Sequence, residues 1–154
     1  MADPRIKFDL FGTYIATIKN SIGTKMFQNI YIIKNGRSID VANGGEFSCA
    51  AFVSSVLVMS DNLIKSSHAT VKRTLEDMQE SGWYKIKKPR EGAVIVWPPW
   101  EKSDHWHIGF YVGKNKSISN DGLGTKTPQK HPITYGKFAR KIDSIWWNNR
   151  LGKK

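Results

Sequence analysis

The stretch AVIVWPPWEKSDHWHIGFYVGKNKSISN, residues 93–120, decides the fold class. It contains three short runs that predict strands, of which the first two are rich in β-branched and aromatic residues. These runs lie at 93–97, 107–113 and 116–120. The polar GKNK sequence between the last two predicts a tight turn, so these two runs are expected to pair as an antiparallel hairpin. A further run, IDSIWW at 142–147, predicts a strand that closes the sheet.

Helical patterns dominate the chain before residue 82. The clearest helix is predicted over 49–59, because apolar side chains fall on one stripe there. The stripe consists of Cys49, Phe52, Val53, Val56 and Leu57. Ser48 is expected to cap this helix with its hydroxyl. Two further helices are predicted over 7–19 and 68–81, the second capped by Ser67, although residues 13–18 would also suit a strand. The apolar, β-branched run NIYII at 29–33 predicts a strand. The expected fold is therefore α+β, with N-terminal helices packed on a small antiparallel β-sheet.

Length and composition predict one domain over residues 1–154. A chain of 154 residues with 40% hydrophobic residues can bury one core, and it contains no apolar run long enough for a membrane helix. The only cysteine, Cys49, excludes an internal disulfide and a thiolate zinc cluster. The amino-terminal sequence lacks the pattern of a secretory signal, so a cytoplasmic location is expected, and reaching a cell wall would require lysis or a signal-independent route.

The net charge of +11 is concentrated in the second half of the chain. Residues 81–154 contain 15 Lys and Arg against 5 Asp and Glu, whereas residues 1–80 contain 9 against 8. All six tryptophans also lie after residue 80. This composition indicates an anionic partner, which could be an anionic wall polymer, a membrane surface or nucleic acid. No recognised nucleic-acid motif favours the last of these.

Two residues carry the predicted chemistry, Cys49 and His107. At the start of a helix, unpaired amides and the macrodipole favour a thiolate, so the Cys49 thiol is expected to have a lowered pKa and to act as a nucleophile. His107 begins a predicted strand and could direct its ring into a cleft between sheet and helix, as a general base.

A third residue would hold the His107 ring in place. A two-residue turn at Lys114 and Asn115 puts residue 109 opposite residue 120, so that Asn120 shares the face of His107. Asn120 is therefore predicted to orient the imidazole through its amide oxygen.

The segments SCAAFVSSVL, EGAVIVW and HIGFYVGKNKSISN together resemble the papain-like cell-wall cysteine hydrolases, namely the NlpC-type peptidases and the CHAP amidohydrolases. The resemblance covers residues 48–121. It implies a papain-like fold with Cys49 as nucleophile, His107 as general base and Asn120 as orienting residue. The implied reaction requires no metal or organic cofactor. Strict family spacing from His107 would instead reach Ser119, and the Asp that usually follows Gly92 is absent. The implied substrates are peptidoglycan stem peptides, cut by an endopeptidase or an amidase.

Three tryptophans near the predicted cleft, Trp97, Trp100 and Trp106, are candidates for lining a substrate groove, whereas Trp146 and Trp147 are expected in the core.

Three other functions remain open from sequence. The same Cys and His pair could serve an acyltransferase of the transglutaminase kind, or the chain could be a non-catalytic basic module that binds an anionic polymer. A zinc site is a third alternative, in which His105 and His107 are joined by His131 or Asp104.

Overall fold

The structure is a computed structural model and describes residues 3–100, 103–136 and 140–152. Its helices are α1 (Leu10–Asn20), α2 (Cys49–Met59) and α3 (Val71–Glu80), with short 3-10 helices η1 (Asn43–Gly45) and η2 (Asn149–Leu151). Its strands are β1 (Tyr31–Lys34), β2 (Arg37–Asp40), β3 (Tyr84–Ile86), β4 (Val94–Trp97), β5 (His107–Tyr111), β6 (Lys116–Asn120), β7 (Pro128–Pro132) and β8 (Ser144–Trp147).

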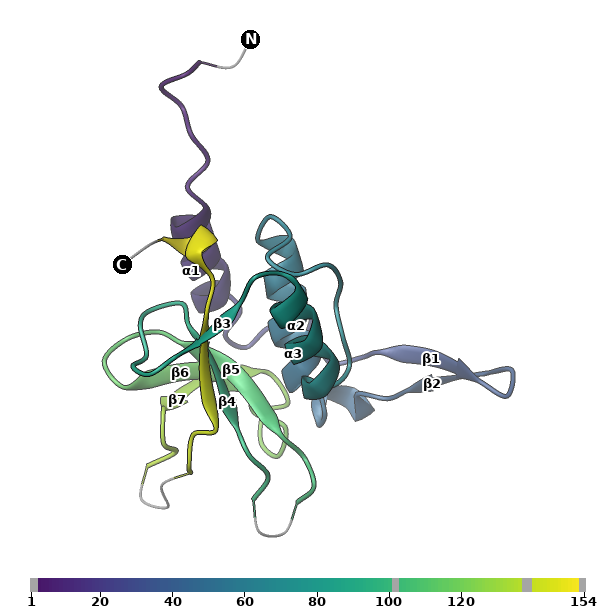
Figure 1. Ribbon diagram of the computed structural model, residues 1–154. Helices are drawn as coiled ribbons and strands as arrows, with labels where there is room; N and C mark the ends of the chain where they lie inside the picture. The colour runs from purple at the N-terminus through teal and green to yellow at the C-terminus, as the bar shows by residue number, and fades with distance from the viewer. Residues whose placement is uncertain (1–2, 101–102, 137–139, 153–154) are drawn as a thin grey trace.

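Six of the strands form one antiparallel sheet in the order β3-β8-β4-β5-β6-β7, and α2 packs across β5 and β6 (Figure 1). Helices precede the sheet along the chain, so the predicted α+β class is confirmed. Trp146 and Trp147 on β8 are buried as expected. Among the described residues, no helix has both the length and the apolar character needed to cross a membrane.

Helix α2 forms where its apolar stripe predicts it, from Cys49 to Met59. Phe52, Val53, Val56 and Leu57 are fully buried, and the Phe52 ring packs edge-on against Phe110 of β5 at 5.4 Å. Burying a side chain of this size contributes about 1.5–3 kcal/mol. The helix is therefore anchored rigidly on the sheet, and its first residue has a fixed position.

The predicted cap of α2 is wrong. The Ser48 hydroxyl accepts no capping hydrogen bond, and among the described residues its buried oxygen has no partner. The reason is the backbone of Ser48, whose φ of -100° and ψ of 9° lie outside the extended region that directs a cap side chain back at the first turn.

The other two helices begin later than predicted, because stronger caps lie further along the chain. Asp9 accepts from the amide of Gly12 at 2.8 Å and starts α1 at Leu10. Thr70 accepts from the amide of Arg73 at 3.2 Å and starts α3 at Val71, so Ser67 is not the cap.

The hairpin of β5 and β6 has a different register from the predicted one. Gly109 lies opposite Ser119, because the turn contains three residues instead of two. These are Gly113, Lys114 and Asn115, which all have positive φ values. A shift of one residue moves every side chain of β6 to the other face of the sheet.

Strands β1 and β2 form a separate two-stranded arm that projects from the body of the protein (Figure 1). Almost all of its residues are exposed, including Ile33, which is 73% exposed. Asp40 fixes the base of the arm by accepting from the amides of Ile30 and Gly44, both at 2.9 Å. These hydrogen bonds, with that of Gly44 largest, lower the pKa of Asp40 to about 2. Strands β2, β3 and β7 were not predicted from the sequence.

Candidate active site

A groove of about 980 Å³ is lined by residues from the start of α2 and from the sheet, and the lining includes the predicted reactive residues. Its lining includes Cys49, His107, Asn120, Trp100, Trp106, Ser119, His131, Tyr135 and Arg140. These residues come from α2, from strands β5 to β7 and from the loops that follow β4 and β7.

Cys49 is the first residue of α2 and is half-buried. Its Sγ lies 3.8 Å from the carbonyl oxygen of Trp106, the residue directly before His107. Burial raises the pKa of the Cys49 thiol, and this outweighs the opposing effects of the backbone amides of Ile108, Ala50 and Cys49 itself and the charge of Arg140. The helix end does favour the thiolate, but the predicted net lowering of the thiol pKa is not found.

The ring of His107 belongs to a hydrogen-bonded cluster centred on the hydroxyl of Ser119. Ser119 Oγ lies 2.8 Å from His107 Nε2, 2.6 Å from His131 Nε2 and 3.0 Å from Tyr135 Oη. His131 Nδ1 in turn lies 2.8 Å from the carbonyl oxygen of Pro132. Four side chains from β5, β6, β7 and the following loop are thus connected through one oxygen.

The direction of each hydrogen bond in this cluster follows from the carbonyl group of Pro132. A carbonyl oxygen only accepts, so His131 carries its proton on Nδ1, and its Nε2 must accept because burial lowers the pKa of His131. The Ser119 hydroxyl therefore donates to His131 and accepts from Tyr135 and from His107 Nε2. Burial raises the pKa of Tyr135 to about 12, which keeps its phenol protonated for this role.

The same reasoning sets the tautomer of His107. Its proton lies on Nε2, which leaves the lone pair of Nδ1 free to accept a proton. Burial lowers the pKa of His107 to about 3, with smaller contributions from the charge of Arg140 and from the repulsion that a protonated His131 would exert. Both the thiol and the imidazole are therefore neutral near pH 7, and His107 is in the form of a base.

The predicted orienting residue, Asn120, lies on the wrong face of β6 to reach His107. Its Nδ2 donates to the carbonyl oxygen of Gly45 at 2.7 Å, and the side chain is buried. The three-residue turn before β6 is the physical reason, because it puts Ser119 on the face of His107. The orienting contact is made by Ser119, the residue that the strict family spacing indicates.

The three predicted groove tryptophans take different positions. Trp100 and Trp106 line the groove and are 52% and 43% exposed. Trp97 is fully buried beneath the cluster, with its ring 5.3 Å from that of His107 and 5.7 Å from that of His131. Trp97 therefore supports the two imidazoles, and it does not line the groove as the sequence suggested.

The zinc alternative gains no support. Within residues 3–100, 103–136 and 140–152, no three His, Cys, Asp or Glu side chains lie close enough together to hold a metal ion. The ring of His105 packs against that of Phe47 in a tilted arrangement, with the ring centres 4.7 Å apart, and His107 and His131 face Ser119.

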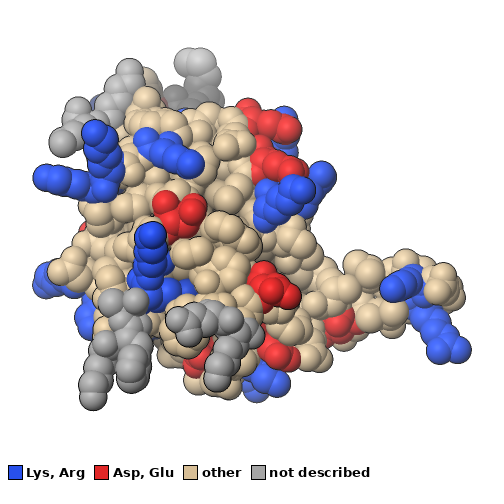
Figure 2. All heavy atoms as spheres, turned by 60° about the horizontal axis from the view of Figure 1, so that its bottom comes forward, with Lys and Arg blue, Asp and Glu red and all other residues tan. Residues whose placement is uncertain are grey.

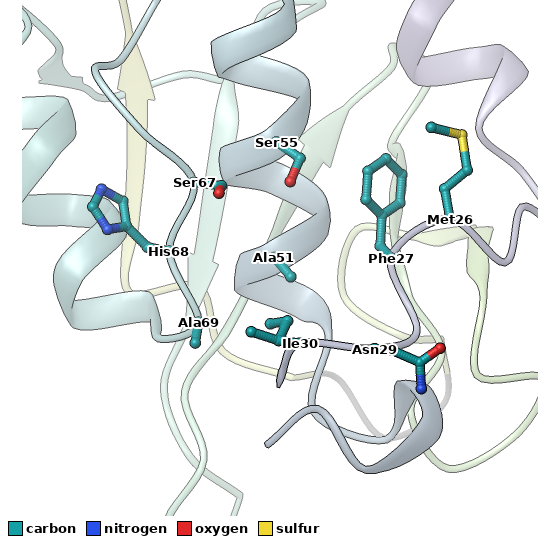
Figure 3. Close-up of a pocket in the computed structure, with 9 residues that line it drawn as sticks. All are labelled: Met26, Phe27, Asn29, Ile30, Ala51, Ser55, Ser67, His68 and Ala69. Atoms are coloured by element: carbon teal, nitrogen blue, oxygen red, sulfur yellow. The ribbon is translucent and has the colours of Figure 1, made fainter. Parts of the chain in front are cut away.

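A second, smaller pocket of about 260 Å³ lies on the outer side of α2 and shares Ala69 with the groove. Figure 3 shows Met26 and Phe27 on one side of the helix and His68 on the other. His68 Nε2 lies 2.7 Å from Asp77 Oδ2, and this contact joins the loop before α3 to the helix itself. The groove that contains Cys49 is therefore the better candidate for chemistry.

The sequence analysis did not assign three residues to the site of Cys49 and His107. These are His131, Tyr135 and Arg140. His131 lies in PQKHP, where prolines at both ends hide the strand β7. Tyr135 and Arg140 lie in irregular chain, where hydrophobic periodicity carries no signal.

Comparisons with known proteins leave this geometry as the main guide to function. No protein-family model matches the sequence, and no curated protein shows significant similarity to it.

Proposed function

We propose that the protein is a cysteine hydrolase of peptide or amide bonds that acts through a thioester intermediate. The observation that carries the proposal is the cluster around Ser119, which fixes His107 as a neutral base with its Nδ1 lone pair available. The only cysteine of the chain begins a helix at the edge of the same groove. A thiol, a base of fixed tautomer and an open groove are the parts that such a reaction needs.

In the first half of the reaction, His107 Nδ1 takes the thiol proton as Cys49 Sγ attacks the carbonyl carbon of the substrate. The carbonyl oxygen becomes an oxyanion, and the backbone amide of Cys49 at the start of α2 donates to it. His107 then gives its proton to the leaving amine as the C–N bond breaks. Because the resting pair is neutral, His107 acts in concert with the attack and no preformed ion pair is required.

In the second half, a water molecule gives a proton to His107 Nδ1 and attacks the thioester carbonyl. The tetrahedral intermediate collapses, the C–S bond breaks, and the thiol of Cys49 regains its proton from His107. Ser119 keeps the imidazolium oriented through both halves, because its oxygen accepts from Nε2 in either protonation state.

The proposed substrates are peptidoglycan stem peptides, on the basis of the resemblance of residues 48–121 to the NlpC-type and CHAP hydrolases. A net charge of +11 favours approach to anionic wall polymers. Basic side chains are spread over the face in Figure 2 with acidic ones between them, which suits a general attraction better than recognition of one polymer.

The test is digestion of purified peptidoglycan and of soluble stem peptides, followed by mass spectrometry of the products. The expected result is release of new amine and carboxylate ends by the native protein and none by Cys49→Ala. If Cys49→Ala releases the same products, or if the native protein releases none from any peptide or amide, the proposal is wrong. An added amine that replaces water as acceptor would identify an acyltransferase instead.

A further inference from the structure

Arg140 is a cation in the groove for which the described residues supply no counter-ion. No Asp or Glu in the described part of the chain forms an ion pair with it. Its Nη2 donates to the carbonyl oxygen of Pro98 at 3.1 Å, while its Nε is buried with no hydrogen-bond partner among the described residues. A half-buried guanidinium with unused donors is costly unless a ligand completes its hydrogen bonds.

The guanidinium is also held in place by aromatic rings. Its Cζ lies 5.4 Å from the ring of Trp100 and 5.6 Å from the ring of Tyr135. Tyr135 is itself fixed by its hydrogen bond to Ser119. Such stacking orders the side chain before any ligand binds, which reduces the entropy lost on binding.

The position of this cation relates it to the reactive thiol. Arg140 and Cys49 line the same groove, and the charge of Arg140 acts on both Cys49 and His107. An anion bound at Arg140 would therefore lie in the same groove as the thiol. The planar fork of a guanidinium matches a carboxylate best, since two parallel hydrogen bonds can form.

We propose that Arg140 forms a carboxylate subsite beside Cys49, which selects substrates with a free carboxylate close to the scissile amide. This inference rests on the proposed hydrolase function for its biological meaning, although the subsite itself does not depend on it. Arg140 is a specificity-determining residue in this account, and the oxyanion is stabilised by the Cys49 amide.

The first experiment needs no substrate. Iodoacetate carries a carboxylate where iodoacetamide carries a neutral amide, and both reagents alkylate thiols. Cys49 is the only cysteine in the sequence, so each rate reports on this thiol alone. Arg140→Gln is expected to lower the ratio of the iodoacetate rate to the iodoacetamide rate by about five- to tenfold. Lys141→Gln removes the same charge from the exposed neighbouring residue and should change the ratio by less than about twofold.

Two outcomes of this experiment would overturn the subsite. One is an unchanged ratio in Arg140→Gln, and the other is an equal fall in Lys141→Gln, which would indicate only the general field of a basic protein. Circular dichroism and thermal unfolding check that each variant folds. If Arg140→Gln does not fold, Arg140→Lys keeps the charge and loses the fork, and it should lower the ratio by about two- to threefold.

The second experiment separates this inference from the proposed function. Two peptide amides are compared that differ only in a carboxylate or a carboxamide next to the scissile bond. Arg140→Gln should raise KM for the carboxylate substrate about tenfold and leave the carboxamide substrate unchanged. An equal fall in kcat for both substrates would make Arg140 an oxyanion donor and refute the subsite. If neither substrate is cut but the alkylation ratio depends on Arg140, the subsite stands and the hydrolase proposal fails.

Discussion

Replacing Ser119 with alanine removes the oxygen that joins three side chains of the site. Ser119→Ala deletes a contact of 2.8 Å to His107, one of 2.6 Å to His131 and one of 3.0 Å to Tyr135. The imidazole of His107 loses the acceptor that fixes its tautomer and its orientation. The nucleophile, Cys49, is untouched by the change.

The expected loss of activity follows from the value of one orienting hydrogen bond. Such a bond in a half-buried site is worth about 1.5–3 kcal/mol, which corresponds to a rate lower by about 10- to 150-fold. The free energy of unfolding falls less, by about 1 kcal/mol, because water from the groove can bind the groups that lose Ser119. The effect on rate should therefore exceed the effect on folding at 25 °C.

The assay is alkylation of Cys49 by iodoacetamide between pH 5 and pH 9, with thermal unfolding in parallel. Ser117→Ala is the matched control, because Ser117 lies on the same face of β6, is fully buried and has an Oγ without a hydrogen-bond partner among the described residues. This variant should alkylate as the native protein does and unfold within about 0.5 kcal/mol of it.

The reasoning would be refuted if Ser119→Ala alkylates at the native rate near pH 7. It would be refuted more specifically if Asn120→Ala loses the reaction instead, since Asn120 is bound to the carbonyl of Gly45 on the other face of the strand.

Three further predictions concern the supports of the site. In Gly109→Ala the new Cβ would lie 2.6 Å from the Cβ of Ser119, so we expect a displaced Ser119 and a fall in alkylation rate of at least about tenfold, and an unchanged rate would contradict this contact. Asp77→Ala removes the buried partner of His68 and should lower the free energy of unfolding by about 2–4 kcal/mol in urea titrations, whereas a loss below 1 kcal/mol would show that the loop is held otherwise. The pKa of His107 is about 3 in the folded state and about 6.5 when unfolded, so unfolded chains bind the extra proton and stability should fall as the pH drops from 6.5 toward 3, by at most about 1.4 kcal/mol per pH unit. Urea titrations across this range should show a shallower slope for His107→Gln, and an equal slope would refute the assignment.

The parts of the fold that sequence predicts best are those with a strong repeating pattern. The apolar stripe of α2 runs over more than two turns, so the start of the helix at Cys49 could be predicted within one residue. His107 begins a run rich in apolar and aromatic residues, and β5 forms there with His107 as its least buried residue. These two patterns are enough to bring the thiol and the imidazole to one groove.

The rest of the site depends on details that have no periodic signal. A single additional residue in the turn after Val112, with Lys114 and Asn115 in the left-handed region, decides that Ser119 and not Asn120 faces His107. Both turn lengths fit the same GKNK sequence. Strand β7, which supplies His131, pairs only with β6 at the edge of the sheet. The strand therefore depends on this pairing, because its own residues carry little strand signal.

The projecting arm offers a convenient attachment point. Its tip is the turn at Asn35 and Gly36, both with positive φ, and a Cβ added at Gly36 would meet nothing within 4 Å. The turn connects two exposed strands that contribute no residue to the groove. An affinity tag or a fluorescent peptide inserted between these two residues should therefore leave the chemistry of Cys49 intact, and would allow the protein to be immobilised with its groove open to large polymers.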